Sequence, residues 1–597
     1  MSVISVIKNI VIYKEPKNNE RFELLEDEQE DMKNGEAPET SETAAQNFNE
    51  NEENILHQPS KNIMQTLKRV MKNKKQEDTP KVTNGITADQ NQDNRNNVSK
   101  DLKKNLQKMK QEFHFSTNQD IVIREFKVVQ KNNAFIVYID GMVDKNTIND
   151  YILRQLMAEQ KNNKNTKISV DYITDNLLAI NQVIRQTDYE EIIKQILNGL
   201  TALFVEGNQE CVLIESRGYE KRSVSTPLDE SVIKGPQEAF TENLRTNLTL
   251  VRKIIKNKDL VTEMMPIGKA ENTACAIMHI KGITNPKIVQ EVKRRISSID
   301  IDFIAGDGGL DQLIEDHPFS LFPQILSTER PDRTASFLMD GKVAIICDGS
   351  PYASIVPITF FRFFHSAEDG TLRWQFGTFL RLIRMVAAFF AMFLPGLFIA
   401  LTLYHQEVIP TELLFSFSKA KENIPIPIIL ELLVMELSFE LMREAGIRLP
   451  GAIGQSLGII GAIVLGSAAV AAGIVSPILI MVVSITGLCG FAIPNFSIAF
   501  GVRIMRFIFI FFGVIAGFYG IAAGIFIFGG LACSMKSFGV PYFSPVAPKT
   551  KANHDIGIMA PPWTLKERPD FLNTNNRKRT NGTVRGWIQQ AKRGNGK

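Results

Sequence analysis

The sequence predicts a soluble α/β N-terminal region of two small subdomains, followed by an α-helical transmembrane bundle of four to five spans. Residues 450–502 contain no Asp, Glu, Lys, Arg or His, and residues 385–404 and 507–535 are likewise uncharged. An apolar helix of roughly 20 residues crosses a hydrocarbon core of about 30 Å. Because lipid offers the backbone no hydrogen bonds, these stretches are expected to be helices. Ahead of them, strand-like and helical patterns alternate, as in α/β domains.

Residues 1–118 are expected to form a disordered tail. Residues 20–53 are acidic, and the sequence that follows is rich in Asn, Gln and Lys. Two basic amphipathic segments interrupt the tail and either dock on a membrane or partner, or form transient helices in solvent. Their apolar faces comprise Ile63, Met64, Leu67, Val70 and Met71 in the first segment, and Leu102, Leu106, Met109 and Phe113 in the second.

The α/β region is expected over residues 119–375. The N-terminus carries no secretory signal, so this region is expected to be cytoplasmic. The five cysteines lie far apart without disulfide or metal spacing, and small apolar fillers are their simplest interpretation. The patterns predict strands at residues 121–129, 134–140, 201–205, 211–215, 274–280, 302–305 and 343–348, and helices at residues 148–157, 236–256 and 286–298.

The transmembrane domain is expected over residues 376–535, and a basic C-terminal tail over residues 536–597. The segment 424–446 is apolar but carries glutamates. If this segment crosses the membrane, there are five spans and the basic tail lies outside. If it is re-entrant, there are four spans and the tail lies on the cytoplasmic side, as the positive-inside tendency prefers. Both arrangements remain open. The expected helices are residues 376–404, 424–446, 451–473, 477–500 and 505–533.

Several strings between residues 188 and 548 resemble the A subunits of spore nutrient germinant receptors, the GerA family of endospore-forming bacteria. The long N-terminal tail lies outside the family pattern. The matching strings are Glu215-Ser-Arg-Gly, Gly235-Pro-Gln-Glu-Ala-Phe-Thr-Glu-Asn-Leu, Asn247-Leu-Thr-Leu-Val-Arg, Pro331-Asp-Arg, Asp348-Gly-Ser-Pro, Arg443-Glu-Ala-Gly-Ile-Arg-Leu-Pro, Ala469-Val-Ala-Ala-Gly-Ile-Val-Ser and Ser537-Phe-Gly-Val-Pro-Tyr.

The resemblance implies a receptor subunit in the inner membrane of the spore. It would act with a transporter-like B subunit and a lipoprotein C subunit, and assemble as a homo-oligomer resembling a pentameric, nutrient-gated cation channel. Three alternatives stay open: a membrane scaffold, a signal-amplifying relative that does not sense nutrient, and a secondary transporter. The transporter would need paired internal repeats in the bundle, and the sequence offers none.

The bundle offers two groups of candidate pore residues. In the small-residue helix, Gln455 and Ser467 are polar candidates, and Val470 and Val475 suit a dewetting gate. Close helix packing explains the same small residues equally well. The second group consists of Glu431, Glu436 and Glu440, which either form cation-attracting rings or, for Glu440, pair with Arg443 or Arg448.

Charged residues of the α/β motifs are candidates for a subunit or domain interface, or for binding an acidic partner. No zinc-protease or nucleophile-elbow motif is present, and the turn Gly306-Asp-Gly-Gly lacks the phosphate-loop pattern. We therefore expect no enzyme activity, catalytic residue, metal, cofactor or nucleic-acid partner. The interface candidates are Arg217, Glu238, Glu242, Arg245 and Arg252.

Overall fold

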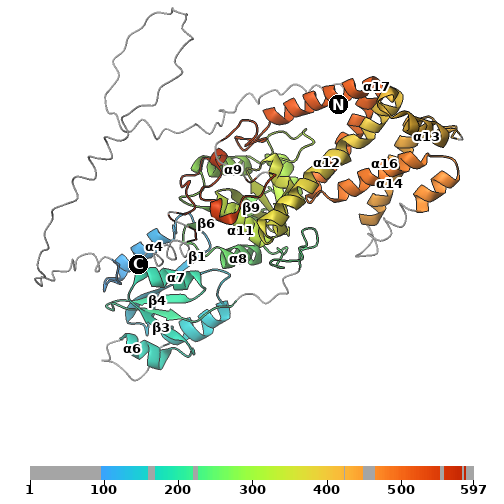
Figure 1. Cartoon of the computed structure of the whole chain (residues 1–597). Helices are drawn as coiled ribbons and strands as arrows, with labels where there is room; N and C mark the ends of the chain where they lie inside the picture. The colour runs from blue at the N-terminus through green and yellow to red at the C-terminus, as the bar shows by residue number, and fades with distance from the viewer. Residues whose placement is uncertain are drawn as a thin grey trace, which may run out of the picture. The chain divides into compact units, whose positions relative to one another are not determined.

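A computed structural model describes residues 96–158, 169–218, 226–422, 424–447, 464–550, 555, 557–580, 582 and 584–585 (Figure 1). The expectations for the acidic block, for the amphipathic segment 63–71 and for Gln455 lie outside these residues.

The first subdomain is built on a five-stranded antiparallel sheet with the order β1-β2-β4-β5-β3. Side chains alternate between its faces, so Phe135 and Val137 pack toward α4 and α7, while Ala134 and Ile136 pack toward the helical segments between β2 and β3. The strands are β1 (Ile121–Val128), β2 (Asn132–Ile139), β3 (Val183–Gln186), β4 (Thr201–Val205) and β5 (Cys211–Ile214); the helices are α4 (Leu102–Glu112), η2 (Thr147–Leu153), α5 (Arg154–Met157), α6 (Val170–Tyr172), η3 (Ile173–Leu177) and α7 (Tyr189–Leu197).

Helix α4 lies within the region that the sequence assigned to the tail. Asp101 caps it by accepting a hydrogen bond from the Lys103 amide at 3.0 Å. Met109 and Phe113 are fully buried in the core of the first subdomain, and Leu106 packs against that core. The shared apolar face is confirmed, but its partner is the sheet, so the subdomain begins before the predicted boundary at residue 118.

The second subdomain repeats the topology of the first. Its antiparallel sheet has the order β6-β7-β9-β10-β8, which is the first order with each strand number raised by five. Helices α8 and α11 cover one face, and α9 and α10 cover the other. The strands are β6 (Leu260–Ile267), β7 (Thr273–Ile280), β8 (Leu326–Thr328), β9 (Val343–Cys347) and β10 (Ala353–Val356); the helices are α8 (Leu244–Ile254), α9 (Pro286–Ser297), α10 (Gly306–Ile314) and α11 (Pro331–Asp340).

The two sheets confirm the predicted α/β architecture, with two local corrections. Residues 302–305 form no strand and lead directly into α10. Helix α8 begins only at Leu244, because Asn243 accepts a hydrogen bond from the Thr246 amide at 3.1 Å and caps it there. The preceding residues 236–243 form no helix, and the Phe240 amide donates to the Glu329 carbonyl at 2.8 Å.

Two helices of the described chain are long and apolar enough to cross a membrane, α12 (Trp374–Leu403) and α17 (Phe496–Ser534). They run alongside each other (Figure 1). Helix α12 agrees with the predicted helix 376–404 to within two residues, and Pro395 lies inside it as expected. The other helices are η4 (Phe360–Phe364), η5 (Ala367–Gly370), η6 (Gln406–Val408), α13 (Thr411–Lys421), α14 (Ile428–Ile447) and α16 (Pro477–Phe491), and residues 464–471 are also helical.

The predicted boundary between helices 477–500 and 505–533 is wrong. Helix α16 ends at Phe491, and Asn495 caps α17 by accepting from the Ile498 amide at 3.2 Å. Helix α17 then breaks at Ala516 and Gly517, where Gly517 has φ of 58°. Beyond the break the chain folds back toward the first half of α17. The close approach of Gly524 to Phe509 shows this, since a Cβ at Gly524 would lie 2.8 Å from the Phe509 ring.

The C-terminal tail returns to the second subdomain. A short hairpin, β11 (Lys536–Ser537) and β12 (Val540–Pro541), inserts Phe538 into the core beside α9 and α10. The Tyr542 hydroxyl donates to the Pro323 carbonyl at 2.7 Å. Farther on lie η7 (Pro562–Thr564) and η8 (Asp570–Leu572), and the Asn575 amide donates to the Ile283 carbonyl at 3.1 Å.

Candidate functional site

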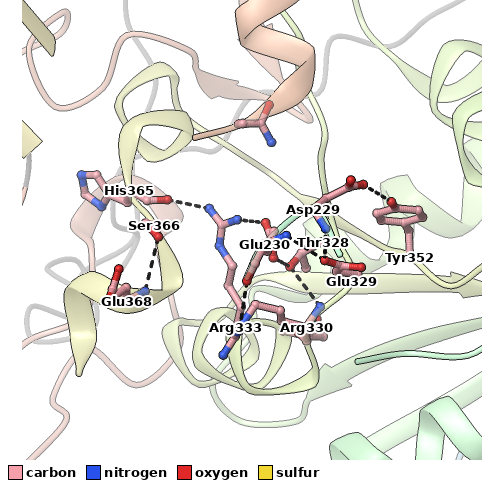
Figure 2. Close-up of polar contacts among 12 residues, drawn as sticks. Asp229, Glu230, Thr328, Glu329, Arg330, Arg333, Tyr352, His365, Ser366 and Glu368 are labelled. Carbon is pink, nitrogen blue, oxygen red and sulfur yellow. Dashed lines mark hydrogen bonds and ion pairs between the residues drawn. The ribbon is translucent and has the colours of Figure 1, made fainter. Parts of the chain in front are cut away.

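The irregular segment 226–240, which we call the strap, is hydrogen-bonded to the start of α11 (Figure 2). Arg330 is 1% exposed. Its guanidinium donates to the strap carbonyls of Glu230 at 3.1 Å and Pro236 at 2.8 Å, and to both carboxylate oxygens of Asp332 at 3.1 Å. Two strings that carried the family resemblance, Gly235-Pro and Pro331-Asp-Arg, therefore meet in space.

The Glu230 carboxylate links these contacts between the strap and α11 to the segment before α12. It accepts hydrogen bonds from Arg333 and from the Thr328 hydroxyl. Arg333 also donates to the His365 carbonyl at 2.9 Å, in the segment that precedes α12 (Figure 2). Nearby, Tyr352 donates to Asp229, and burial raises the pKa of Tyr352. The contacts link the strap, α11 and the start of the apolar helix.

A second group of charges surrounds the first turns of α12. Asp369 accepts from Arg381 at 3.0 Å and from Arg384 at 2.8 Å. Arg381 also pairs with Asp555 of the C-terminal tail, and Arg362 lies 3.6 Å from the same carboxylate. The start of α12 is thereby bonded both to the second subdomain and to the tail.

A third group of charges lies between α14 and α17. The Arg506 guanidinium is 3.0 Å from Glu436 and donates a hydrogen bond to Glu440. Arg503 and Arg443 each lie 3.9 Å from the Glu440 carboxylate. Glu436 and Arg506 are almost completely buried. We call these five residues the α14–α17 charge cluster. Desolvated charges are stable only when they are paired in this way.

Glu431 has a different partner. Its carboxylate accepts a hydrogen bond at 3.1 Å from the amide of Ser476, the residue that caps α16. A carboxylate at a helix N-terminus is favourable, because the first amides of the helix carry a partial positive charge. Glu431 therefore fixes the start of α16 against α14.

The structure places the other pore candidates as follows. Val475 is buried in an apolar cluster with Leu432 and Leu479, so it contributes to packing between helices. Ser467 is exposed and donates to the Val464 carbonyl at 3.0 Å, and Val470 is half-buried. Neither lies in the α14–α17 charge cluster.

Two of the interface candidates join the subdomains. Arg252, on α8, pairs with Asp120 ahead of β1 at 2.6 Å, and both side chains are buried. Arg245, also on α8, pairs with Asp140 after β2 at 2.8 Å. These arginines thus hold the second subdomain to the first.

The remaining candidates make more local contacts. Arg217 pairs with Glu215 at 2.6 Å, close to the end of β5. Glu238, in the strap, pairs with Lys253 of α8 at 2.6 Å. The Glu242 side chain is exposed, and its backbone carbonyl accepts a hydrogen bond at 2.8 Å from the turn between β9 and β10.

Sequence reasoning missed the residues that complete these sites. Arg503 falls between the predicted helices 477–500 and 505–533, and Arg506 falls at the start of the second; neither was selected as a candidate, and both lie within α17. Arg333 belongs to the Pro331-Asp-Arg string, and Arg330 directly precedes it. The family resemblance of that string was the signal that could have identified both arginines. Asp369 gave no signal. Among the residues that the structure describes, no group of three or more His, Cys, Asp or Glu side chains could hold a metal ion.

Glu230→Ala should lower the free energy of unfolding by about 2–4 kcal/mol, because it leaves the Arg333 side chain, which is only 9% exposed, without its carboxylate. Glu238→Ala is the matched control in the same strap. Its pair with Lys253 is exposed and should contribute less than about 1 kcal/mol. Thermal unfolding of the purified full chain in detergent measures both, and equal effects would contradict a fastening role for Glu230.

Comparison with known proteins supports this reading of the motifs. Residues 107–571 match the family described as Bacillus/Clostridium GerA spore germination protein. Spore germination protein KA of Bacillus subtilis (strain 168) is 38% identical over 485 residues, which is 81% of this chain and 88% of that protein. Spore germination protein GerLA of Bacillus cereus is 37% identical over 457 residues, 76% of this chain and 92% of the relative.

A solved structure is also similar. The crystal structure of the N-terminal domain of the A subunit of the Bacillus megaterium spore germinant receptor GerK3 is 35% identical, covers 44% of this chain and 97% of its own, and has a TM-score of 0.36. The family match spans most of the chain, and the two relatives are matched over most of their own length. The chain belongs to the GerA family of spore germination proteins.

Proposed function

We propose that this chain is the A subunit of a spore nutrient germinant receptor and forms an oligomeric, ligand-gated cation channel. It acts with a transporter-like B subunit and a lipoprotein C subunit in the spore inner membrane. The single observation that carries the channel proposal is the α14–α17 charge cluster, five charged side chains set among apolar helices.

Charges within a membrane bundle are costly and commonly mark ion paths or specific pairs. In the closed receptor, Arg506 neutralises Glu436 and Glu440. Nutrient binding to the receptor separates α14 from α17, and the released carboxylates then attract cations along the oligomer axis. Two carboxylates per subunit become a ring of acidic side chains only when several copies assemble.

We also propose an even number of crossings, which is the four-span arrangement. The residues before α12 and those after α17 bind the same subdomain, because Arg333 of α11 donates to the His365 carbonyl and the Asn575 amide donates to the Ile283 carbonyl. A segment that leaves one folded body and returns to it crosses the bilayer an even number of times. The N-terminal region and the basic tail then both lie on the cytoplasmic side, in line with the positive-inside tendency.

Spores that carry Glu436→Gln should release cations at least about tenfold more slowly in response to nutrient, because the ring loses half its charge. Potassium release and receptor abundance are measured together. Glu412→Gln is the matched control, since Glu412 is an exposed carboxylate on α13. Unchanged release from spores with normal amounts of Glu436→Gln receptor would contradict the ion path.

The double variant Glu436→Gln/Arg506→Gln separates conduction from packing. Removing one charge of each sign leaves Glu440 with Arg503 and Arg443, so the abundance of the receptor should recover at least in part. If the cluster only holds the helices together, cation release recovers too; if it lines the path, release stays low. Conductance of the reconstituted chain then distinguishes a channel from a membrane scaffold.

A further inference from the structure

Two of the five cysteines face each other across the second sheet. Strands β7 and β9 are antiparallel, and Cys275 is the direct register partner of Cys347. No local pattern indicates this pairing, because α9, α10, β8 and α11 separate the two residues along the chain. The third buried cysteine, Cys211, lies on β5 of the other sheet.

The hydrogen-bond pattern fixes how close the two cysteines are. The Asp348 amide donates to the Ala274 carbonyl at 2.9 Å, so the neighbouring residue pair is the hydrogen-bonded one. Bonded and non-bonded pairs alternate along an antiparallel ladder, which makes Cys275 and Cys347 a non-hydrogen-bonded pair. In such pairs the Cα atoms lie about 4.5 Å apart, within the range that a disulfide spans.

The surroundings of the pair restrict what can reach it. Both side chains are buried in the core between the sheet and helices α9 and α10, next to Ile277 and Ile345. The adjacent Cys347 thiol, together with burial, raises the pKa of Cys275. The thiolate fraction is therefore small, and only a small neutral oxidant enters this core without unfolding it.

We propose that Cys275 and Cys347 form a reversible dithiol–disulfide site that responds to small neutral peroxides. One thiolate attacks the peroxide, whose O–O bond breaks to give a sulfenic acid and one water. The second thiol then attacks the sulfenic sulfur and releases a second water. Overall one S–S bond forms, two S–H bonds break, and the two electrons lost by sulfur reduce hydrogen peroxide to two waters.

Oxidation ties the middle of the second sheet together. The disulfide closes a chain loop that contains α11, the helix to which the strap is fastened. Closing a long loop restricts the unfolded chain and stabilises the folded one. The oxidised subdomain therefore resists any rearrangement that would separate β7 from β9, while the reduced one does not.

The test uses the purified full chain in detergent, treated with hydrogen peroxide under native conditions. After alkylation and digestion, mass spectrometry should find a linked peptide containing both cysteines, lighter than its two thiol peptides together by about 2 Da. Dithiothreitol should reverse the link. The thermal unfolding midpoint should rise by a few degrees, on the order of 5 °C, only in the oxidised protein.

Matched variants identify the site. Cys275→Ala and Cys347→Ala should each abolish the linked peptide and the shift in midpoint, while Cys211→Ala, which removes another buried thiol, should keep both. Oxidation of the exposed Cys533 reports that the peroxide was active. Cys533 oxidation without a native link between Cys275 and Cys347, or a link that forms only in denaturant, would overturn the proposal and leave the two cysteines as apolar filler.

Discussion

Arg252→Met should lower the free energy of unfolding of the α/β region by about 3–5 kcal/mol. Arg252 donates to both carboxylate oxygens of Asp120, at 2.6 and 3.0 Å, and to the Leu260 carbonyl at 2.6 Å. Arg252 is 2% and Asp120 6% exposed. Methionine fills a similar volume, so the loss comes mainly from leaving the Asp120 carboxylate buried without its counter-charge.

Arg245→Met provides the matched control. Arg245 lies on the same helix and also bonds across to the first subdomain, through Asp140 at 2.8 Å, but its side chain is 67% exposed. Solvent screens such a pair, and the expected loss is below about 1 kcal/mol. Circular dichroism of the full chain during chemical unfolding measures both variants.

A double variant tests the cause of the loss. Asp120→Leu/Arg252→Met removes both charges, so it should recover part of the stability lost in Arg252→Met. If the double variant is no more stable than the single one, lost packing and hydrogen bonds rather than a stranded carboxylate explain the effect. A small loss in Arg252→Met itself would mean that the pair does not hold the subdomains together.

Gly513→Val should disrupt the contact between α12 and α17 and cost on the order of 3 kcal/mol. A Cβ at Gly513 would lie 2.7 Å from the Gly396 carbonyl oxygen, and a Cβ at Gly396 would lie 2.8 Å from the Phe509 carbonyl oxygen. Both neighbours are backbone atoms, so no side-chain rotation relieves the clash. Two glycines let the two helix backbones touch, as small residues do in membrane bundles.

Gly529→Val on the same helix is the control, since a Cβ there would meet no heavy atom within 4 Å. Both variants are equally β-branched and apolar, so helix propensity and hydropathy change alike. Thermal aggregation of the detergent-solubilised chain should begin at a lower temperature for Gly513→Val only. A comparable shift in the two variants would attribute the effect to the glycine itself rather than to the helix contact.

Local pattern predicted much of this fold. The long apolar run of α12 predicted both helix ends to within two residues, although Arg381 and Arg384 lie near its start. The β1–β2 hairpin followed from two alternating runs around a polar turn. The start of α17 was missed, because apolar residues lie on both sides of the Asn495 cap and hydropathy carries no signal there.

The sites were harder to predict, since their partners come from distant parts of the chain. Glu436 had no local partner in the sequence, and Arg506 reaches it from another helix. Arg252 was selected as an interface residue, but nothing local pointed to Asp120. Pairing across a fold depends on which elements become neighbours, and one sequence does not contain that information in its local patterns.

The returning tail has a mechanical consequence. Helix α12 starts on the second subdomain through Arg381 and Asp369, and the chain after α17 is fixed to the same body through Phe538 and Tyr542. Because both ends of the bundle are attached to the second subdomain, its first and last helices cannot slide or rotate independently of each other. Movement that originates in the second subdomain reaches the bundle through both ends at once, and among the described helices α14 and α16 lie between those ends.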